Sequence, residues 1–364
     1  MPKPVVNAIV NYLADEEYYG GYEIAEKRAS ELQEYYYYAA RLFNSKSTNI
    51  AYTTNATDSY NKALSSIPFR KGDVILISEN DYPSNFIAFL SMQKRLGIKL
   101  KLVKNIPTGE IDLDDLEKKV KKHEPKLVSL THVPTSSGLV QPVTEVGDIT
   151  RKYDTLFLLD ACQSLGQLPV EAAQTNADFI SGTFRKFLRG PRGGGLLYVS
   201  EKALSSGLEP LYLDLRGADW VADKEYNARH DARRFEVWET AYALMIGGKE
   251  ALKYMLTIGL DDIQEQNKKL LNLLRKELEN ISSIQLQDKG EHLCNIVSFS
   301  VPNRDQHQTK QYFSSKGINI YTTPKSSALI DYEEKGIDWT VRVSPHYYNT
   351  EDEIGKFIEA VKQL

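Results

Sequence analysis

Lys186 lies in a segment whose residue types could support covalent chemistry. The segment 181–191 reads SGTFRKFLRGP, follows an apolar run that ends at Ile180, and is closed by Gly190-Pro191. We therefore expect a rigid turn after a buried strand. An amine packed among apolar side chains is desolvated, which lowers its pKa and makes it nucleophilic, as a Schiff-base lysine requires. The apolar neighbours are Phe184, Phe187 and Leu188. On this segment alone, a solvated basic loop with Arg185, Arg189 and Arg192 is the favoured interpretation.

Asp160 supplies a second reactive group. It ends the apolar run 156–160, LFLLD, which is typical of a buried parallel strand. A carboxylate at such a strand end is costly unless it is paired with a positive group. A protonated pyridine nitrogen would be such a partner, and the pairing would keep the ring an electron sink. The alternative is a structural aspartate that caps the next turn.

Three further strand ends carry polar or aromatic residues. The turn Asn55-Ala56-Thr57 opens a predicted helix, and its free N–H groups and helix dipole suit a phosphate. The same three residues would also be present if the turn were only an ordinary N-cap. Tyr82 precedes a proline, so its ring could stack on a planar cofactor or simply lie buried at the start of a helix. Thr135 offers a hydroxyl to a ring substituent. A phosphate turn, a stacking ring, a strand-end aspartate and a strand-end lysine, in that order, describe a pocket for pyridoxal 5'-phosphate.

Composition excludes several classes of protein. The chain has 364 residues and a net charge of −4 with scattered Lys and Arg, so we expect no nucleic-acid surface. The two cysteines are not paired in spacing, no apolar run reaches about 20 residues, and no signal-peptide layout is visible. The six histidines show no metal-ligand spacing. We expect a cytoplasmic protein with no membrane segment and no metal.

The order of predicted elements indicates the fold class. Strand-like and helical segments alternate from residue 50 to residue 200, which predicts an α/β, doubly wound, mostly parallel sheet with ligands at the carboxyl ends of its strands. A long amphipathic helix is expected over 22–43. After residue 240 the pattern becomes that of a smaller α+β domain. We therefore divide the chain into an N-terminal segment (1–20), a large cofactor-binding α/β domain (21–240) and a small C-terminal α+β domain (241–364).

These features together resemble the fold-type I pyridoxal-phosphate enzymes of the class V aminotransferase and cysteine desulfurase family. The resemblance covers nearly the whole chain, and its clearest motifs are LLDACQSLGQLPV, RKFLRGPRGGGLLYV and VRVSPHYYNTEDEI. Through YPSN, HVPT, RKFLRGPRG and RFEVWE, the chain is most similar to the branch that holds ergothioneine-type C–S lyases and isopenicillin-N-epimerase-like proteins.

The resemblance implies a role for each candidate residue. Lys186 would form the aldimine and move the Cα proton, Asp160 would pair with the pyridine nitrogen, and Gln163 would lie near the phenolic oxygen. Tyr82 stands where most relatives have a stacking histidine, so the stacking is kept but imidazole chemistry is lost. Arg342 would grip the substrate carboxylate, for which a bidentate arginine is suited. The phosphate-binding positions are Ala56, Thr57, Thr183 and Arg185, and Thr135 takes a site usually held by asparagine.

The main departure from the family pattern concerns cysteine. Desulfurases carry a catalytic cysteine on a loop of the small domain, whereas the corresponding region here, TTPKSSALIDYEEKGIDWT, has none. Cys162 adjoins Asp160 and Cys294 lies in a strand pattern, so a persulfide route is disfavoured. Residues 234–240, RFEVWET, resemble a loop that reaches the partner's phosphate site, which implies a homodimer with shared active sites.

Three functions remain open from the sequence. The first is a lyase that cleaves the Cβ–S bond of a cysteine-derived amino acid or its sulfoxide through a quinonoid, and the second is a transaminase or epimerase that begins with the same proton abstraction. The third is a non-catalytic homologue. Selectivity among amino-acid substrates is expected to come from Tyr18, Tyr19, Tyr321 and the loop 323–335.

Overall fold

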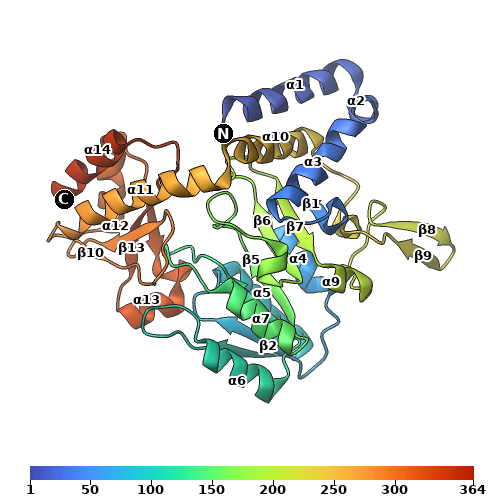
Figure 1. Ribbon diagram of the computed structural model, residues 1–364, viewed down its shortest axis with the longest axis horizontal. Helices are drawn as coiled ribbons and strands as arrows, with labels where there is room; N and C mark the ends of the chain where they lie inside the picture. Colours follow the sequence, from blue (N-terminus) through green and yellow to red (C-terminus); the bar gives the residue numbers. More distant parts are fainter.

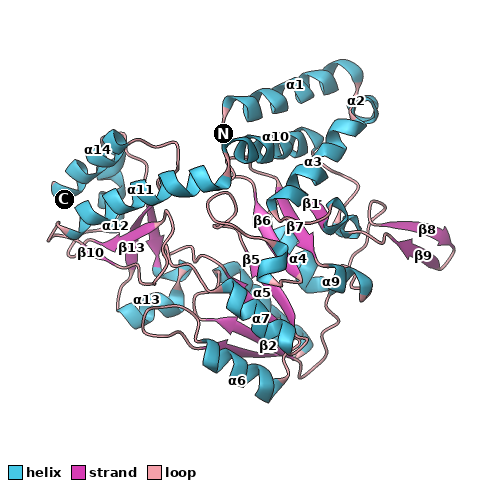
Figure 2. Cartoon of the chain, in the orientation of Figure 1, coloured by secondary structure: helices cyan, strands magenta, loops and turns pink.

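The computed structural model describes residues 1–364, and a seven-stranded sheet forms its larger body (Figures 1 and 2). The strand order is β1-β7-β6-β5-β4-β2-β3. The four pairs from β6 to β3 are parallel, so the predicted doubly wound, mostly parallel α/β fold is confirmed. The strands are β1 (Ile50–Thr53), β2 (Val74–Ser78), β3 (Lys99–Val103), β4 (Leu127–Thr131), β5 (Leu156–Asp160), β6 (Phe179–Thr183) and β7 (Gly195–Val199).

Two antiparallel pairings decide where the strand ends meet. β7 runs antiparallel to both β6 and β1. Two reversals restore the original direction, so β1 points the same way as β6, β5 and β4. The residues that follow these four strands therefore share one edge of the sheet, as the rule for ligand sites in open α/β sheets requires.

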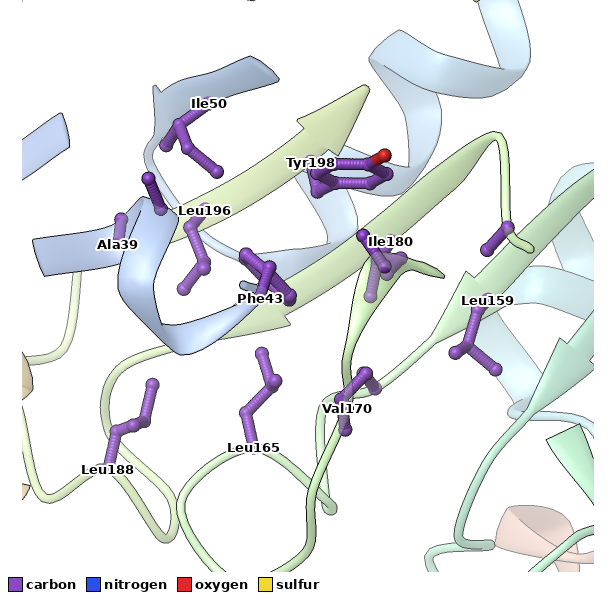
Figure 3. Packing of buried hydrophobic residues seen from close by; sticks show 14 of the residues in the cluster. Ala39, Phe43, Ile50, Leu159, Leu165, Val170, Ile180, Leu188, Leu196 and Tyr198 are labelled. Carbon is purple, nitrogen blue, oxygen red and sulfur yellow. The ribbon is translucent and has the colours of Figure 1, made fainter. Parts of the chain in front are cut away.

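Helices cover both faces of this sheet. The 38-residue cluster on one face includes the side chains shown in Figure 3, where Leu165 and Leu188 pack with Ile180 and Leu196. Leu165 and Leu188 belong to the loops that follow Asp160 and Lys186, so burial of these leucines fixes both loops on the core. The helices of this face are α1 (Lys3–Tyr19), α3 (Ala29–Leu42), α6 (Leu113–His123), α7 (Val143–Lys152) and α10 (Tyr242–Ile258), and those of the other face are α4 (Ala56–Ser66), α5 (Pro83–Leu96) and α9 (Glu201–Ser205).

The C-terminal part forms a smaller α+β body with its own core. Its four-stranded antiparallel sheet has the order β10-β11-β13-β12. β12 begins at Tyr321, and before it the Ile318 N–H donates to the Phe313 oxygen at the end of the preceding helix. The elements are α11 (Leu260–Glu279), β10 (Gln285–Leu286), β11 (Val297–Ser300), α12 (Gln306–Ser315), β12 (Tyr321–Pro324), α13 (Leu329–Lys335), β13 (Trp339–Val343) and α14 (Glu351–Lys362).

Several elements differ from the sequence-based expectations. The predicted helix 22–43 is two helices, α2 (Gly21–Lys27) and α3, separated at Arg28, whose guanidinium pairs with Asp15 of α1. The hairpin of β8 (Ala218–Ala222) and β9 (Glu225–Ala228) projects from the large body and was not predicted. α10 packs on α1 and α3 and adds to the large core, so the predicted boundary at residue 240 precedes a helix that packs with the large body. The three-part division of the chain stays a prediction.

Candidate active site

A cavity of about 200 Å³ lies at the carboxyl edge of the large sheet. It brings together side chains from five segments that are far apart in the sequence. Every residue predicted to bind the cofactor lines it: Asn55, Ala56, Thr57, Tyr82, Thr135, Asp160, Gln163, Thr183, Arg185 and Lys186. The sequence analysis missed Asn85, Thr131, Val133 and Cys162, which also line the cavity.

The N-terminus of α4 forms one wall of the cavity. Asn55 is the N-cap, and its Oδ1 accepts a hydrogen bond from the Asp58 N–H at 3.0 Å. The N–H groups of Ala56 and Thr57 precede the first intrahelical bond and have no partner, so they can bind an anion. Gly195 of β7 permits this wall, because a Cβ there would lie 2.6 Å from the Asn55 carbonyl carbon.

Asp160 lies buried at the bottom of the cavity. Its Oδ1 accepts from the Cys162 N–H at 2.9 Å, and its Oδ2 accepts from the Asn85 amide at 3.3 Å. Burial raises the pKa of Asp160, and the positive charge of Lys186 and these hydrogen bonds partly offset that effect. A cationic ring nitrogen beside this carboxylate would supply the missing compensation.

A second buried carboxylate, Asp81, lies behind Asp160. Its Oδ1 accepts from the Tyr82 N–H, the Thr131 hydroxyl and the Asn85 amide. Asn85 therefore bridges two carboxylates. Burial raises the pKa of Asp81 to about 6, although its hydrogen bonds act in the opposite direction. The only sequence signal for this arrangement is the spacing of Asp81 and Asn85 by one helical turn at the start of α5.

Lys186 occupies a tight turn, as predicted, but its amine is not enclosed as expected. The Arg189 N–H donates to the Lys186 oxygen, and the Gly190 N–H donates to the Phe184 oxygen. Phe184 and Leu188 turn into the large core and bury the turn, which leaves the lysine itself partly exposed on the cavity side. The expected enclosure of the amine by these apolar side chains is therefore not seen.

The Lys186 turn is held against the loop that follows Asp160. A Cβ on Gly166 would lie 2.6 Å from the Phe187 carbonyl carbon, so the two backbones approach as closely as glycine allows. On the other side, the Arg189 guanidinium packs over the Tyr348 ring at 4.2 Å and bonds the Tyr347 hydroxyl at 3.1 Å. The relative position of Asp160 and Lys186 is thus fixed by contacts with both bodies.

Arg342 lies on β13, outside the cavity that holds the other candidates. Its Nη1 donates to the main-chain oxygen of Thr135 at 2.8 Å and to the Thr135 hydroxyl at 3.2 Å. Its Nε is buried without a partner, and burial lowers the pKa of the guanidinium. A carboxylate ligand would accept a hydrogen bond from this Nε, and its negative charge would offset the cost of burying the guanidinium. Thr135 also accepts from the Gln163 amide at 3.4 Å, so it connects Arg342 to the cavity.

Neither cysteine is placed as a nucleophile. Burial raises the pKa of Cys162 to about 11 and that of Cys294 to about 12, so both are thiols at neutral pH. Cys294 packs in a small apolar cluster with Val133 and Phe187. Tyr18 and Tyr19 are two of the residues expected to contribute to selectivity. They lie exposed at the end of α1 and line neither this cavity nor the cavity that adjoins it between α5 and α13.

The donor set fits pyridoxal phosphate. Two cations, Arg185 and Lys186, face one buried carboxylate, which leaves positive charge for a phosphate beside the unpaired N–H groups of α4. Asp160 matches a protonated ring nitrogen, and Tyr82 provides an aromatic wall. No group of three or more histidine, cysteine or acidic side chains is arranged to hold a metal ion. None of the helices is long and apolar enough to cross a membrane.

Comparisons with known proteins cover the whole chain. The family model "Aminotransferase class-V" matches residues 1–357. A probable cysteine desulfurase of Methanothermobacter thermautotrophicus is 30% identical over 100% of this chain and 92% of its own length. An apo structure of a cysteine desulfurase from Thermococcus onnurineus NA1 has a TM-score of 0.90, with 27% identity over 100% of this chain and 91% of that one. The cystine C–S lyase C-DES, bound to cysteine persulfide, has a TM-score of 0.89 with 22% identity over 100% and 95%.

Proposed function

The chain belongs to the class-V aminotransferase family, and we propose that it uses pyridoxal 5'-phosphate to cleave the Cβ–S bond of a cysteine-derived amino acid or its sulfoxide. The observation that carries the proposal is the meeting of Asp160, Lys186, Arg185 and the α4 N-terminus in one cavity. When bound there, the cofactor draws electrons from the substrate Cα and makes its proton acidic.

The protein's own residues divide the work of binding. The N–H groups of Ala56 and Thr57, with Thr183 and Arg185, hold the phosphate. The Asp160 carboxylate holds the positive charge on the ring nitrogen, and Asn85 and the Cys162 N–H keep that carboxylate in place. Tyr82, Thr135 and Gln163 line the same cavity, so Tyr82 would pack on the ring, and Thr135 and Gln163 would face its substituents.

Proton transfer falls to Lys186. Its amine lies at the cavity surface and can take the proton from the substrate Cα and later return one. Arg342 fixes the substrate carboxylate, so the Cα–H bond is oriented toward that amine. Loss of the Cα proton and of the sulfur leaving group then gives pyruvate and ammonia once water is added, and the sulfur leaves as a thiol, or as a sulfenic acid where the substrate is a sulfoxide.

The lack of a suitable thiol favours elimination over a persulfide route. The relatives are named as cysteine desulfurases, but the segment of the small body beside the cavity carries Ser326 and Ser327 and no cysteine. That the chain is most similar to the branch of C–S lyases and epimerases stays a prediction. That its substrate is a sulfoxide stays a prediction as well.

Product analysis tests the proposal directly. Protein loaded with the cofactor is incubated with S-substituted cysteines and, separately, with free cysteine. Equal amounts of thiol, pyruvate and ammonia support a lyase. Amino-group exchange, with a keto acid and an aminated cofactor, would support a transaminase. A D-amino acid as product would support an epimerase, and alanine as product would support a desulfurase. Absence of near-visible absorbance and of a borohydride-trapped adduct on Lys186 would point to a non-catalytic homologue.

We also propose a homodimer and a cytoplasmic location. The region of the hairpin β8–β9 exposes large apolar side chains, among them Tyr212, Trp220 and Trp238, which a second copy could cover. Light scattering on the purified protein tests this. A monomer at micromolar concentration would reject the dimer.

A further inference from the structure

A second cavity of about 220 Å³ adjoins the candidate active site. It lies between α5 of the large body and the segment 326–331 of the small body, which includes the start of α13. Tyr82 and Thr135 line both cavities, so the two spaces adjoin at these residues. Thr135 is also the residue that Arg342 contacts.

The walls of this cavity offer mainly apolar surface. Phe86, Ile87 and Leu90 face it from α5, and Leu329 and Ile330 face it from α13. Ile87, Leu90 and Leu329 are 67%, 54% and 56% exposed, although they lie beside a site that a ligand would enter. Exposed apolar area that a ligand can cover favours binding, because its burial removes it from water.

The acidic side chains and the asparagine that line the same cavity already have partners. Asp331 pairs with Lys335 at 2.8 Å, and the Asn80 amide donates to the Gly109 oxygen at 2.9 Å. Glu79 accepts from the Asn105 N–H, and Asp81 is satisfied within its buried network. These groups are occupied within the protein, so none of them is left without a partner for a charged ligand. Besides Tyr82 and Thr135, the remaining polar groups of the lining are the hydroxyls of Ser136, Ser326 and Ser327.

We propose that this cavity receives an apolar substituent on the substrate sulfur, so the substrate is an S-alkyl or S-arylmethyl cysteine with a group about the size of a benzene ring. This inference rests on the proposed lyase function. A substrate with its carboxylate on Arg342 and its Cα at Lys186 has the second cavity as the adjoining space. A cavity of about 150 Å³ holds benzene, so the volume here is sufficient for a ring.

The reaction balances without an oxidant. The Cα–H and Cβ–S bonds break, the sulfur leaves with a proton as the thiol R–SH, and one water is consumed as the remaining three carbons become pyruvate and the amine becomes ammonium. Free cysteine has no group to fill the second cavity, so it is the poorer substrate.

The test separates binding from chemistry. The probes are 3-(benzylsulfanyl)propanoate and 3-(methylsulfanyl)propanoate, which lack the amine and cannot react, and their affinities for the cofactor-loaded protein are measured by calorimetry. We expect the benzyl probe to bind at least about tenfold more tightly, since each added apolar group in a pocket contributes a factor of that order. S-benzyl-cysteine should likewise exceed S-methyl-cysteine about tenfold or more in kcat/KM for thiol release.

Two variants on the same helix provide a matched pair. Leu90→Ala removes a cavity wall, whereas Leu96→Ala alters a leucine of similar exposure, 46%, that does not line the cavity. Leu90→Ala should weaken the benzyl probe several-fold and leave the methyl probe unchanged, and Leu96→Ala should change neither. Equal affinity for both probes, or equal effects of both variants, would overturn the assignment. If the protein preferred the benzyl probe but released no thiol from S-benzyl-cysteine, the lyase reaction would be rejected. The assignment of the cavity as a binding site for an apolar group would stand.

Discussion

The Arg342 guanidinium donates two hydrogen bonds to Thr135, one to its main-chain oxygen at 2.8 Å and one to its hydroxyl at 3.2 Å. The arginine belongs to the small sheet and the threonine follows a strand of the large one. This contact places a positive charge beside Thr135, which lines both cavities, and the carboxylate of an amino acid could replace the hydrogen bonds to Thr135.

Arg342→Lys is expected to lower kcat/KM by about 10- to 100-fold, mainly by raising KM, because a lysine cannot make the paired hydrogen bonds of a guanidinium. Steady-state kinetics on an S-substituted cysteine measures the change. The same substrate as its amide provides the control, since wild type and variant should then differ little. An unchanged KM would mean that another group binds the carboxylate.

Asp160→Asn should have opposite effects on the cofactor-free and the cofactor-loaded protein. Burial raises the pKa of Asp160, so the charged form is penalised in the folded state at pH 8, and the neutral amide should raise the melting temperature of the cofactor-free protein. Turnover should fall by about 100-fold or more, because a buried ion pair with the ring nitrogen is lost. Asp223→Asn, an exposed change between β8 and β9, should alter neither value. A fully active Asp160→Asn variant would contradict the role of Asp160 as the partner of the ring nitrogen.

Asp81 should make stability depend on pH between about pH 4 and pH 6. Burial raises its pKa to about 6 in the folded protein, so in this window the folded state holds a proton that the unfolded chain has released. The free energy of unfolding therefore falls as the pH rises. Asp81→Asn should remove a change of about 2–3 kcal/mol, measured by urea unfolding at several pH values. Parallel profiles for wild type and variant would contradict this.

Replacing both cysteines should leave lyase turnover within about twofold of wild type. Cys162→Ser and Cys294→Ala are suitable changes because the first site is partly exposed and the second is buried among apolar side chains. Thiol and pyruvate release measure turnover, and cyanolysis measures protein-bound persulfide, which we expect to be absent in both proteins. Loss of activity together with loss of a persulfide signal would restore the desulfurase route.

The tyrosine at the ring position should be replaceable by another aromatic residue. Tyr82→Phe keeps the flat ring and should retain turnover within a few-fold, whereas Tyr82→Ala should weaken cofactor binding, seen as a higher cofactor concentration for half-maximal absorbance. A large loss with Phe would assign the hydroxyl a part in proton transfer.

The sequence alone determined the fold class and most of the residues that line the main cavity. Buried parallel strands are apolar on both faces, so their ends can be read from the chain, and a polar residue there, such as Asp160 or Thr135, is conspicuous. Because β1, β4, β5 and β6 point the same way, residues that follow them had to meet at one edge.

Only the tertiary structure decided how these residues are supported and what lies next to them. The bridge from Asp81 through Asn85 to Asp160, the bond from Arg342 to Thr135 and the second cavity between α5 and α13 all join segments with no common sequence pattern. The partial exposure of Lys186 has the same origin, because its apolar neighbours turn toward the core and away from the amine. Periodicity shows which face of an element is buried, but the contacts between elements are set by how the whole chain packs.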